Sequence, residues 1–288
     1  MNLLLPFDHR FFRAQDGGIF SDKAYQHSFF QSRYLQVFEH VYVLARVQDV
    51  PCAKALTEPV EGPGVTLLAL PDWNGSLGFL RHRARIVAAA SEALRRPSAV
   101  IMIGPGGIGS LLFNGLRKRG RPIGLEIVGD HWDAFQPGAI RHPLRPVLRW
   151  HLTRSLRKYC ASAAAASYVT NRFLQERYPC PSFSIGVSDV VLPDSVFVGT
   201  PRRYAPATCR TAICVAVING YKGHDVLIDA LANSRGMGIE LRLVLVGDGP
   251  LQGEIQCRVE QKGLCESVRF AGQLPSGAAV REELGFRP

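Results

Sequence analysis

Short apolar runs alternate with amphipathic segments along almost the whole chain, and this alternation constrains the fold more than any other feature. Runs such as HVYVLARV at 40–47 and SAVIMIG at 98–104 carry few polar residues. Strands of this kind are buried on both faces, which happens when helices cover both sides of a parallel sheet. The segments between them have apolar residues at helical spacing. We therefore predict an α/β fold built on parallel sheets.

The predicted elements fall into two groups, separated by a segment rich in proline, arginine and small polar residues. In the first group we expect strands at 2–7, 40–47, 65–70, 98–104, 122–129 and 166–170, and helices at 22–38, 77–95, 108–119, 143–163 and 171–178. The second group has strands at 211–218, 241–248 and 267–272, each followed by a helix. We predict a first domain at 1–192, a linker at 193–208 and an incomplete second domain at 209–288.

The composition is that of a globular protein with excess positive charge. Hydrophobic residues make up 47% of the 288 positions, and the formal net charge is +10. Such a charge favours an acidic partner: a phosphorylated substrate, an anionic membrane surface or nucleic acid. No recognised motif supports nucleic-acid binding. The seven cysteines are scattered without a CxxC pair, so neither a zinc site nor a disulfide framework is expected.

No segment predicts secretion or membrane insertion. The start, MNLLLPFDHRFF, lacks the basic region and the long apolar run of a signal peptide. The longest apolar stretch, SAVIMIGPGGIGSLLF, is interrupted by proline and glycines and is too short to span a bilayer comfortably. We expect a cytoplasmic protein without a transmembrane helix, with peripheral contact at the inner membrane surface as a further hypothesis.

A lysine stands immediately before a predicted helix in GYKGHDVLIDALA, residues 220–232. The positive end of the helix dipole disfavours a cation there and favours an anion. Lys222 therefore either points into water or holds an anion together with the helix N-terminus. The residues alone leave both interpretations open.

A second anion-site candidate is the glycine-rich turn GPGGIG at 104–109. It fits the dinucleotide-binding pattern G-x-G-x-x-G at Gly104, Gly106 and Gly109, and Asp130 follows 21 residues later, where a ribose-binding acid is sought. That pattern normally follows the first strand of its fold, whereas about three predicted strands precede it here. NAD binding is therefore a minor alternative to a plain strand-to-helix turn.

Three segments of the second group occur in an informative order: YKGHDVLIDALA, LRLVLVGDGPLQGEI and GLCESVRFAGQLP. They resemble the nucleotide-sugar half of family-four retaining glycosyltransferases. The first group, with GDHWDAFQPG and the basic segment after it, is similar to the acceptor domain of the same family. The resemblance covers nearly the whole chain and implies the GT-B arrangement, in which two Rossmann-like domains face each other across a cleft and the C-terminal one holds the donor.

The resemblance implies a site for the diphosphate of a nucleotide-sugar, which becomes the leaving group. Without a metal, fixed positive charge and backbone N–H groups must stabilise that charge. No Asp-x-Asp motif occurs, so neither metal nor cofactor is expected. The residues implied to meet the donor are Lys222, Gly223, Gly17, Gly18, Gly247 and Gly249. The alternative for the glycine pairs is a flexible turn or a helix-entry turn.

The family also carries a polar residue, commonly histidine, beside the reacting sugar. His131 or Asp130 fills that place here, with a solvent-facing loop histidine as the alternative for His131. Two features depart from the family: no arginine precedes Lys222 in CVAVING, and the chain stops before the pair of glutamates that contact the donor. Glu282 and Glu283 are adjacent and are not that pair. We therefore expect a truncated donor domain and little or no transfer by this chain alone.

A basic helix is predicted in HPLRPVLRWHLTRSLRKYCASA at 142–163. Its expected apolar stripe consists of Leu144, Leu148, Leu152, Leu156 and Tyr159. A solvated face explains the arginines on the other side but not a tryptophan among them. An amphipathic ring surrounded by cations suits the surface of an anionic membrane. We predict membrane contact through Arg149, Trp150, Arg154 and Arg157.

Three functions follow in order of preference. The first is a glycosyltransferase that moves a sugar from a nucleotide-sugar to a polysaccharide or lipid-linked acceptor. The second is a non-enzymatic remnant of such a protein, and the third is an NAD-binding protein.

Overall fold

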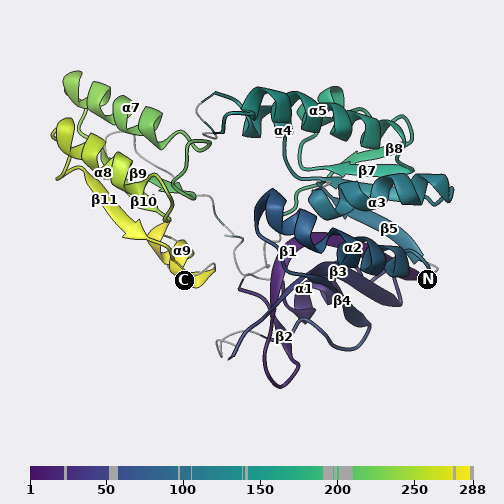
Figure 1. Ribbon diagram of the computed structural model, residues 1–288. Coiled ribbons are helices and arrows are strands. Elements are labelled where there is room, and N and C mark those ends of the chain that lie inside the picture. Colours follow the sequence, from purple (N-terminus) through teal and green to yellow (C-terminus); the bar gives the residue numbers. More distant parts are fainter. Residues whose placement is uncertain are drawn as a thin grey trace. The chain divides into compact units, whose positions relative to one another are not determined.

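The computed structural model describes the chain apart from residues 23–24, 52–57, 97, 105, 138, 140–141, 191–196, 198–199, 201–209, 275–276 and 286–288. Two compact units are present (Figure 1). The first consists of Met1–Asp130 and His151–Val191, and the second of His131–Trp150 and Leu192–Pro288. Nearly all of the predicted linker at 193–208 lies outside the described residues, so the predicted domain boundaries stay predictions.

The first unit is built on a sheet with the strand order β4-β3-β1-β5-β6-β7-β8, in which all neighbours are parallel. A short strand, β2, pairs antiparallel with β1. The strands are β1 (Asn2–Arg13), β2 (Ile19–Phe20), β3 (His40–Asp49), β4 (Val65–Pro71), β5 (Ser98–Ile103), β6 (Ile123–Ile127), β7 (Ala165–Tyr168) and β8 (Phe183–Gly186). The α/β fold with parallel sheets is thus confirmed.

Side chains of the central strands are buried on both faces, because helices cover both. Along β1, Leu3 and Leu5 enter one core cluster with Phe30 of α1 (His27–Arg33), whereas Leu4 enters the other. This second cluster also receives buried side chains from α2 (Gly75–Ala93), α3 (Gly107–Lys118) and α5 (Arg145–Ala161). The short helix α6 (Phe173–Arg177) also belongs to the first unit, whereas α4 (His131–Ala134) and the first residues of α5 belong to the second.

The second unit repeats the strand–helix alternation around a parallel sheet of order β11-β10-β9. Its elements are β9 (Thr211–Val215), α7 (His224–Gly236), β10 (Arg242–Val246), α8 (Gln252–Gln261), β11 (Val268–Gly272) and α9 (Ala278–Glu283). Ile228 and Leu231 of α7 pack with Leu243 and Leu245 of the sheet. Asp229 also ties α7 to α8: its carboxylate pairs with Arg258 and, at 3.0 Å, with Lys262.

Differences from the predicted elements have local causes. β1 runs on to Arg13 because its pairing with β3 resumes at Arg10 after a bulge. The helix predicted at 22–38 is limited to α1, since the chain turns at 34–37. Strands β2 and β8 were not predicted: the first has two residues, and no residue of the second is buried, so neither forms an apolar run.

Candidate functional site

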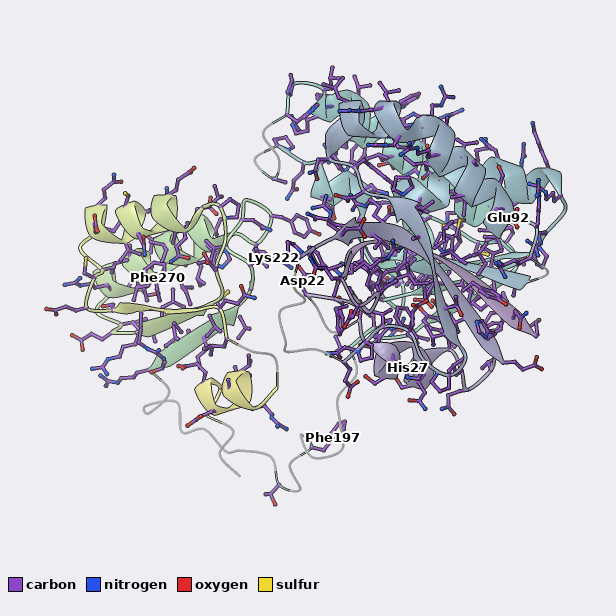
Figure 2. All side chains as sticks on the ribbon, turned by 60° about the horizontal axis from the view of Figure 1, so that its bottom comes forward. Asp22, His27, Glu92, Phe197, Lys222 and Phe270 are labelled. Carbon is purple, nitrogen blue, oxygen red and sulfur yellow. The ribbon has the colours of Figure 1, made fainter. Side chains whose placement is uncertain are left out.

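In open α/β sheets ligands bind beyond the carboxyl ends of the strands, and in the second unit the turn before α7 lies there. Asn219 organises this turn: its carbonyl accepts from the Lys222 amide at 3.3 Å, and its Oδ1 accepts from the Tyr221 amide at 3.1 Å. Gly223 then adopts the left-handed conformation with φ of 68°, which glycine reaches without strain. The Lys222 side chain is left exposed at the entrance to the helix (Figure 2).

The start of α7 offers backbone donors next to this lysine. Gly223 is the N-cap residue and no side chain caps the helix. The first helical bond runs from the Leu227 amide to the Gly223 carbonyl, so the amides of the preceding turn have no partner within the helix. A cation beside such donors is suited to an anion such as a diphosphate. Asp225, the acidic residue of the first turn, opposes an anion at this place.

His224 is the first residue of α7, and its burial was not predicted from the sequence. The side chain is only 2% exposed, and its Nε2 lies 3.9 Å from the Cys214 sulfur. Its Nδ1 has no hydrogen-bond partner among the described residues. Burial lowers the pKa of His224, Asp225 opposes that shift and Lys222 adds to it, so the imidazole is neutral at pH 7. No local sequence signal marks a histidine of this kind.

Gly247 and Gly249, the second predicted donor pair, serve close packing after β10. A Cβ on Gly247 would lie 2.1 Å from the Ala216 carbonyl oxygen, and one on Gly249 would lie 2.3 Å from that of Ile218. Their amides are already bonded, to Gly272 O at 2.8 Å and to Asp248 Oδ1 at 2.6 Å. The geometry therefore explains both glycines without a ligand.

Gly17 and Gly18 form the turn between β1 and the antiparallel β2. The Gly17 amide donates to Ala14 O at 3.0 Å, and the Gly18 amide donates to Asp16 Oδ1 at 2.9 Å. Gly17 has φ of 86°, so the turn itself requires glycine there. As with the previous pair, the observed hydrogen bonds favour the turn over a phosphate contact.

The glycine-rich turn before α3 is already occupied by a carboxyl group of the protein itself, that of Asp8. The Asp8 carboxylate accepts from the Ile108 amide at 3.2 Å, and a Cβ on Gly106 would lie 1.9 Å from its Oδ2. Loss of surrounding water raises the pKa of Asp8, against the lowering effects of the Ile108 amide and Arg46. Asp8 thus occupies the place at the helix start that a pyrophosphate takes in a dinucleotide site.

Asp130 and His131 follow β6 and differ in surroundings. Asp130 is buried; its carboxylate pairs with Arg177 and accepts from the Tyr178 hydroxyl at 2.5 Å. We therefore assign Asp130 a structural role in holding this end of the sheet. His131 is half-buried at the first position of α4.

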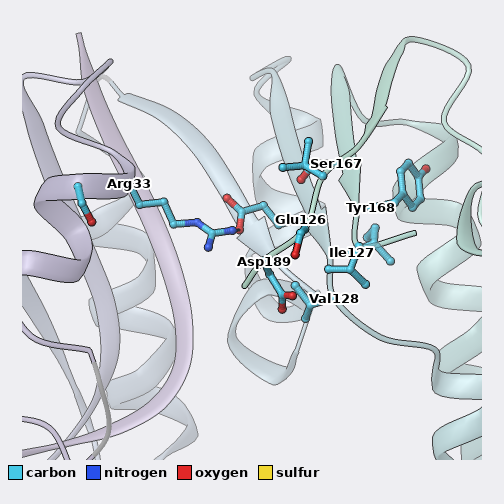
Figure 3. A pocket seen from close by; sticks show the side chains of 11 residues that line it. Arg33, Glu126, Ile127, Val128, Ser167, Tyr168 and Asp189 are labelled. Atoms are coloured by element: carbon cyan, nitrogen blue, oxygen red, sulfur yellow. Dashed lines mark hydrogen bonds and ion pairs between the residues drawn. The ribbon is translucent and has the colours of Figure 1, made fainter. Parts of the chain in front are cut away.

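A cavity of about 390 Å³ lies at the carboxyl ends of β6 and β7 in the first unit. Figure 3 shows the Arg33 guanidinium directed at the Glu126 carboxylate, 2.8 Å away. The buried Tyr34 hydroxyl also donates to Glu126, at 3.2 Å, and burial together with this carboxylate raises the Tyr34 pKa. Hydroxyl, acidic and apolar groups share the wall, namely Ser32, Ser167, Ser188, Asp189, Ile127 and Val128. The sequence does not predict this cavity, because the residues that line it are far apart in the chain.

The basic helix α5 exposes apolar as well as charged side chains. Trp150 is 61% exposed, and Val147 one turn earlier is also exposed. Arg149 donates to Trp132 O at 2.7 Å, with its guanidinium 3.7 Å from that ring's centroid, and Arg157 donates to Arg177 O at 3.0 Å.

The apolar stripe predicted for this helix is partly wrong. Leu144 precedes the helix and is exposed, and the fully buried positions are Thr153, Leu156 and Cys160. Tyr159 packs on the core as predicted, with its ring centroid 4.2 Å from that of Phe113.

Across the described ranges, no helix combines the length and apolar character needed to cross a membrane. The same residues contain no group of three or more His, Cys, Asp or Glu side chains arranged for a metal ion. That the protein works without a metal stays a prediction.

Sequence comparisons identify relatives of both parts of the chain. Residues 204–284 match the family model "Glycosyl transferases group 1". Protein CapJ of Staphylococcus aureus is 24% identical over 221 residues, which cover 76% of this chain and 55% of CapJ. The putative glycosyltransferase EpsF of Bacillus subtilis is 41% identical over 58 residues, which cover 20% of this chain and 15% of EpsF. The chain thus spans about half of the first relative and a small part of the second.

Solved structures share the fold over almost the whole chain. The lipopolysaccharide outer core galactosyltransferase WaaB, in its apo form, aligns with a TM-score of 0.56 at 18% identity, covering 98% of this chain and 71% of WaaB. Anabaena Alr3699/HepE, in complex with UDP and glucose, aligns with a TM-score of 0.51 at 13% identity, covering 96% and 70%. The chain therefore has an α/β fold with parallel sheets resembling GT-B glycosyltransferases, and its residues 204–284 match a glycosyltransferase group 1 domain.

Proposed function

We propose that this chain is the donor- and acceptor-binding part of a glycosyltransferase that uses a nucleotide-sugar. The observation that carries the proposal is the start of α7, where an exposed lysine precedes an uncapped helix inside the segment that matches glycosyltransferase group 1. The HepE structure of similar fold is a complex with UDP and glucose, which supports a nucleoside diphosphate as the bound group.

The proposed chemistry places the leaving diphosphate at this helix start. When the sugar–phosphate bond breaks, negative charge grows on the diphosphate. Lys222 and the amides of the first turn of α7 would stabilise that charge without moving, which is the most effective form of electrostatic catalysis. The neutral His224 beneath the turn adds no charge of its own. Lys222 and Gly223 are the donor-binding residues that we retain from the sequence.

The acceptor is proposed to be a polysaccharide or lipid-linked sugar bound by the first unit. The cavity beside Arg33 and Glu126 offers both donors and acceptors of hydrogen bonds next to apolar side chains. That mixture suits a polyhydroxylated ring, whose hydroxyls donate and accept while its C–H groups need an apolar wall. By resemblance to the family, His131 is the residue proposed to lie near the reacting sugar.

Lys222→Ala is expected to weaken the binding of UDP or GDP by about 1–3 kcal/mol, the scale of a charge-assisted hydrogen bond. Isothermal titration of parent and variant measures this loss. Lys118→Ala is the matched control, because Lys118 is an exposed lysine at the end of α3 in the other unit. Equal affinity of the parent and Lys222→Ala for the diphosphates would favour the alternative in which Lys222 only points into water. Tighter binding of NAD than of either diphosphate would favour the dinucleotide alternative.

We further propose that α5 contacts anionic membrane. Exchanging Arg149, Arg154 and Arg157 for glutamate is expected to abolish most binding to anionic vesicles, since each cation contributes about 1 kcal/mol near such a surface. Trp150→Ala should reduce it. Sedimentation with vesicles at low and moderate salt measures the effect. The control exchanges the exposed Arg210, Arg235 and Arg242 for glutamate, which changes the net charge equally but outside α5. Equal loss of binding in both triple variants would contradict a specific role for α5.

A further inference from the structure

Helix α2 exposes an apolar stripe that the fold does not use. Leu77 is 84% exposed, Leu80 60% and Val87 41%, and Ala84 and Ala88 are also exposed. These positions are spaced i, i+3, i+7, i+10 and i+11, which places them on one side of a helix. The buried residues Ile86, Ala90 and Ala93 occupy the other side and enter the core. The helix is therefore apolar on two faces, of which the sheet covers one.

Basic side chains border this stripe. Arg81, Arg83 and Arg85 are all exposed on α2. The one acidic residue of the helix, Glu92, lies near its C-terminal end (Figure 2) and pairs with Arg95 at 2.9 Å. An apolar stripe with a basic border is the pattern of a helix that lies in a membrane interface.

The helices α3 and α5, on the same face of the sheet, also expose basic side chains. α2, α3 and α5 send buried side chains into one core cluster, so they cover the same face of the sheet. α3 and the C-terminal half of α5 contain no acidic residue. Their exposed basic residues are Arg117, Lys118, Arg154, Arg157 and Lys158.

We propose that the outer side of α2, with its apolar residues Leu77, Leu80 and Val87, inserts into the headgroup region of an anionic lipid bilayer. The charges on this surface are complementary to anionic lipid headgroups. The stripe and the adjacent helices expose several cations and a single carboxylate, that of Glu92, which is already paired with Arg95. The leucines supply the apolar contact that charge alone lacks. This docking surface extends the proposed contact of α5 and is independent of the donor site at α7.

The test compares vesicles of phosphatidylcholine with and without phosphatidylglycerol at low salt. We expect the parent to sediment with the anionic vesicles only, and Leu77→Asp/Leu80→Asp to weaken partitioning at least about tenfold, given the free energy of burying two leucine side chains. Arg81→Glu/Arg85→Glu should weaken it by a similar factor. Val37→Asp is the control, because Val37 is equally exposed but follows α1 on the other face of the sheet.

Both α2 variants should keep the parent's melting temperature and UDP affinity, which separates failed docking from a failed donor site. No sedimentation of the parent with anionic vesicles overturns the proposal. So does equal sedimentation with uncharged vesicles, or parent-like binding by the Leu77→Asp/Leu80→Asp variant. Self-association of the parent that this variant abolishes, without vesicle binding, would assign the stripe to a protein contact instead.

Discussion

Asp130→Ala is expected to lower the free energy of unfolding of the first unit by about 3–5 kcal/mol, because it breaks a buried ion pair by removing one partner. The carboxylate is buried between Arg177 and the fully buried Tyr178, whose hydroxyl donates to it at 2.5 Å. Without it, a largely buried guanidinium and a buried hydroxyl lose their acceptor. Urea unfolding followed by circular dichroism measures the change.

Two variants calibrate this result. Asp130→Asn keeps a hydrogen-bond acceptor but loses the charge. Its free energy of unfolding should therefore lie between those of the parent and Asp130→Ala. Asp49→Ala removes a carboxylate from an exposed pair with Arg13 at 3.5 Å and should cost less than about 1 kcal/mol. If Asp130→Ala left stability unchanged but abolished sugar transfer by a complete enzyme, the structural role would be wrong and the catalytic role implied by the family would stand.

Gly247→Ala is expected to destabilise the second unit by at least about 3 kcal/mol, through backbone strain and overpacking together. The residue has φ of 136°, and the new Cβ would lie 2.1 Å from the Ala216 carbonyl oxygen. Either the turn after β10 or the segment after β9 must shift. Thermal unfolding should show a lowered transition assigned to the second unit.

Gly253→Ala is the matched control in the same unit. Gly253 lies in α8 with open space around its Cβ position, so alanine should be neutral or stabilise the helix by about 0.5–1 kcal/mol. A Gly247→Ala variant as stable as the parent would show that the turn is open, and Gly247 would again be a candidate for donor binding.

The fold was largely predictable because its signals are local. Buried parallel strands such as β3 and β5 are continuous apolar runs, and the helical spacing of apolar residues predicts α7. β8 was not predictable, since none of its residues is buried and its pairing with β7 supplies its structure. Leu144 was assigned wrongly because periodicity gives the face of a helix but not the residue at which it begins.

The candidate site was only partly predictable, because hydrogen-bond partners depend on the tertiary fold. The turn at 104–109 has the spacing of a dinucleotide site, yet the group that occupies it is the Asp8 carboxyl, which lies 100 residues from Ile108 in the chain. Gly17, Gly18, Gly247 and Gly249 likewise use their amides within the protein. Lys222 and Gly223 differ, since the turn that positions them is formed by adjacent residues.

The central claim is that a nucleoside diphosphate binds at the start of α7, and the most direct measurement is the titration of nitrogen-15-labelled protein with UDP, followed by amide resonances. We predict that the amides of residues 222–226 shift together and saturate at one dissociation constant, while those at the start of α3, where Asp8 holds the helix end, do not move. Shifts confined to the start of α3, or no shift of residues 222–226 with either UDP or GDP, would contradict the claim.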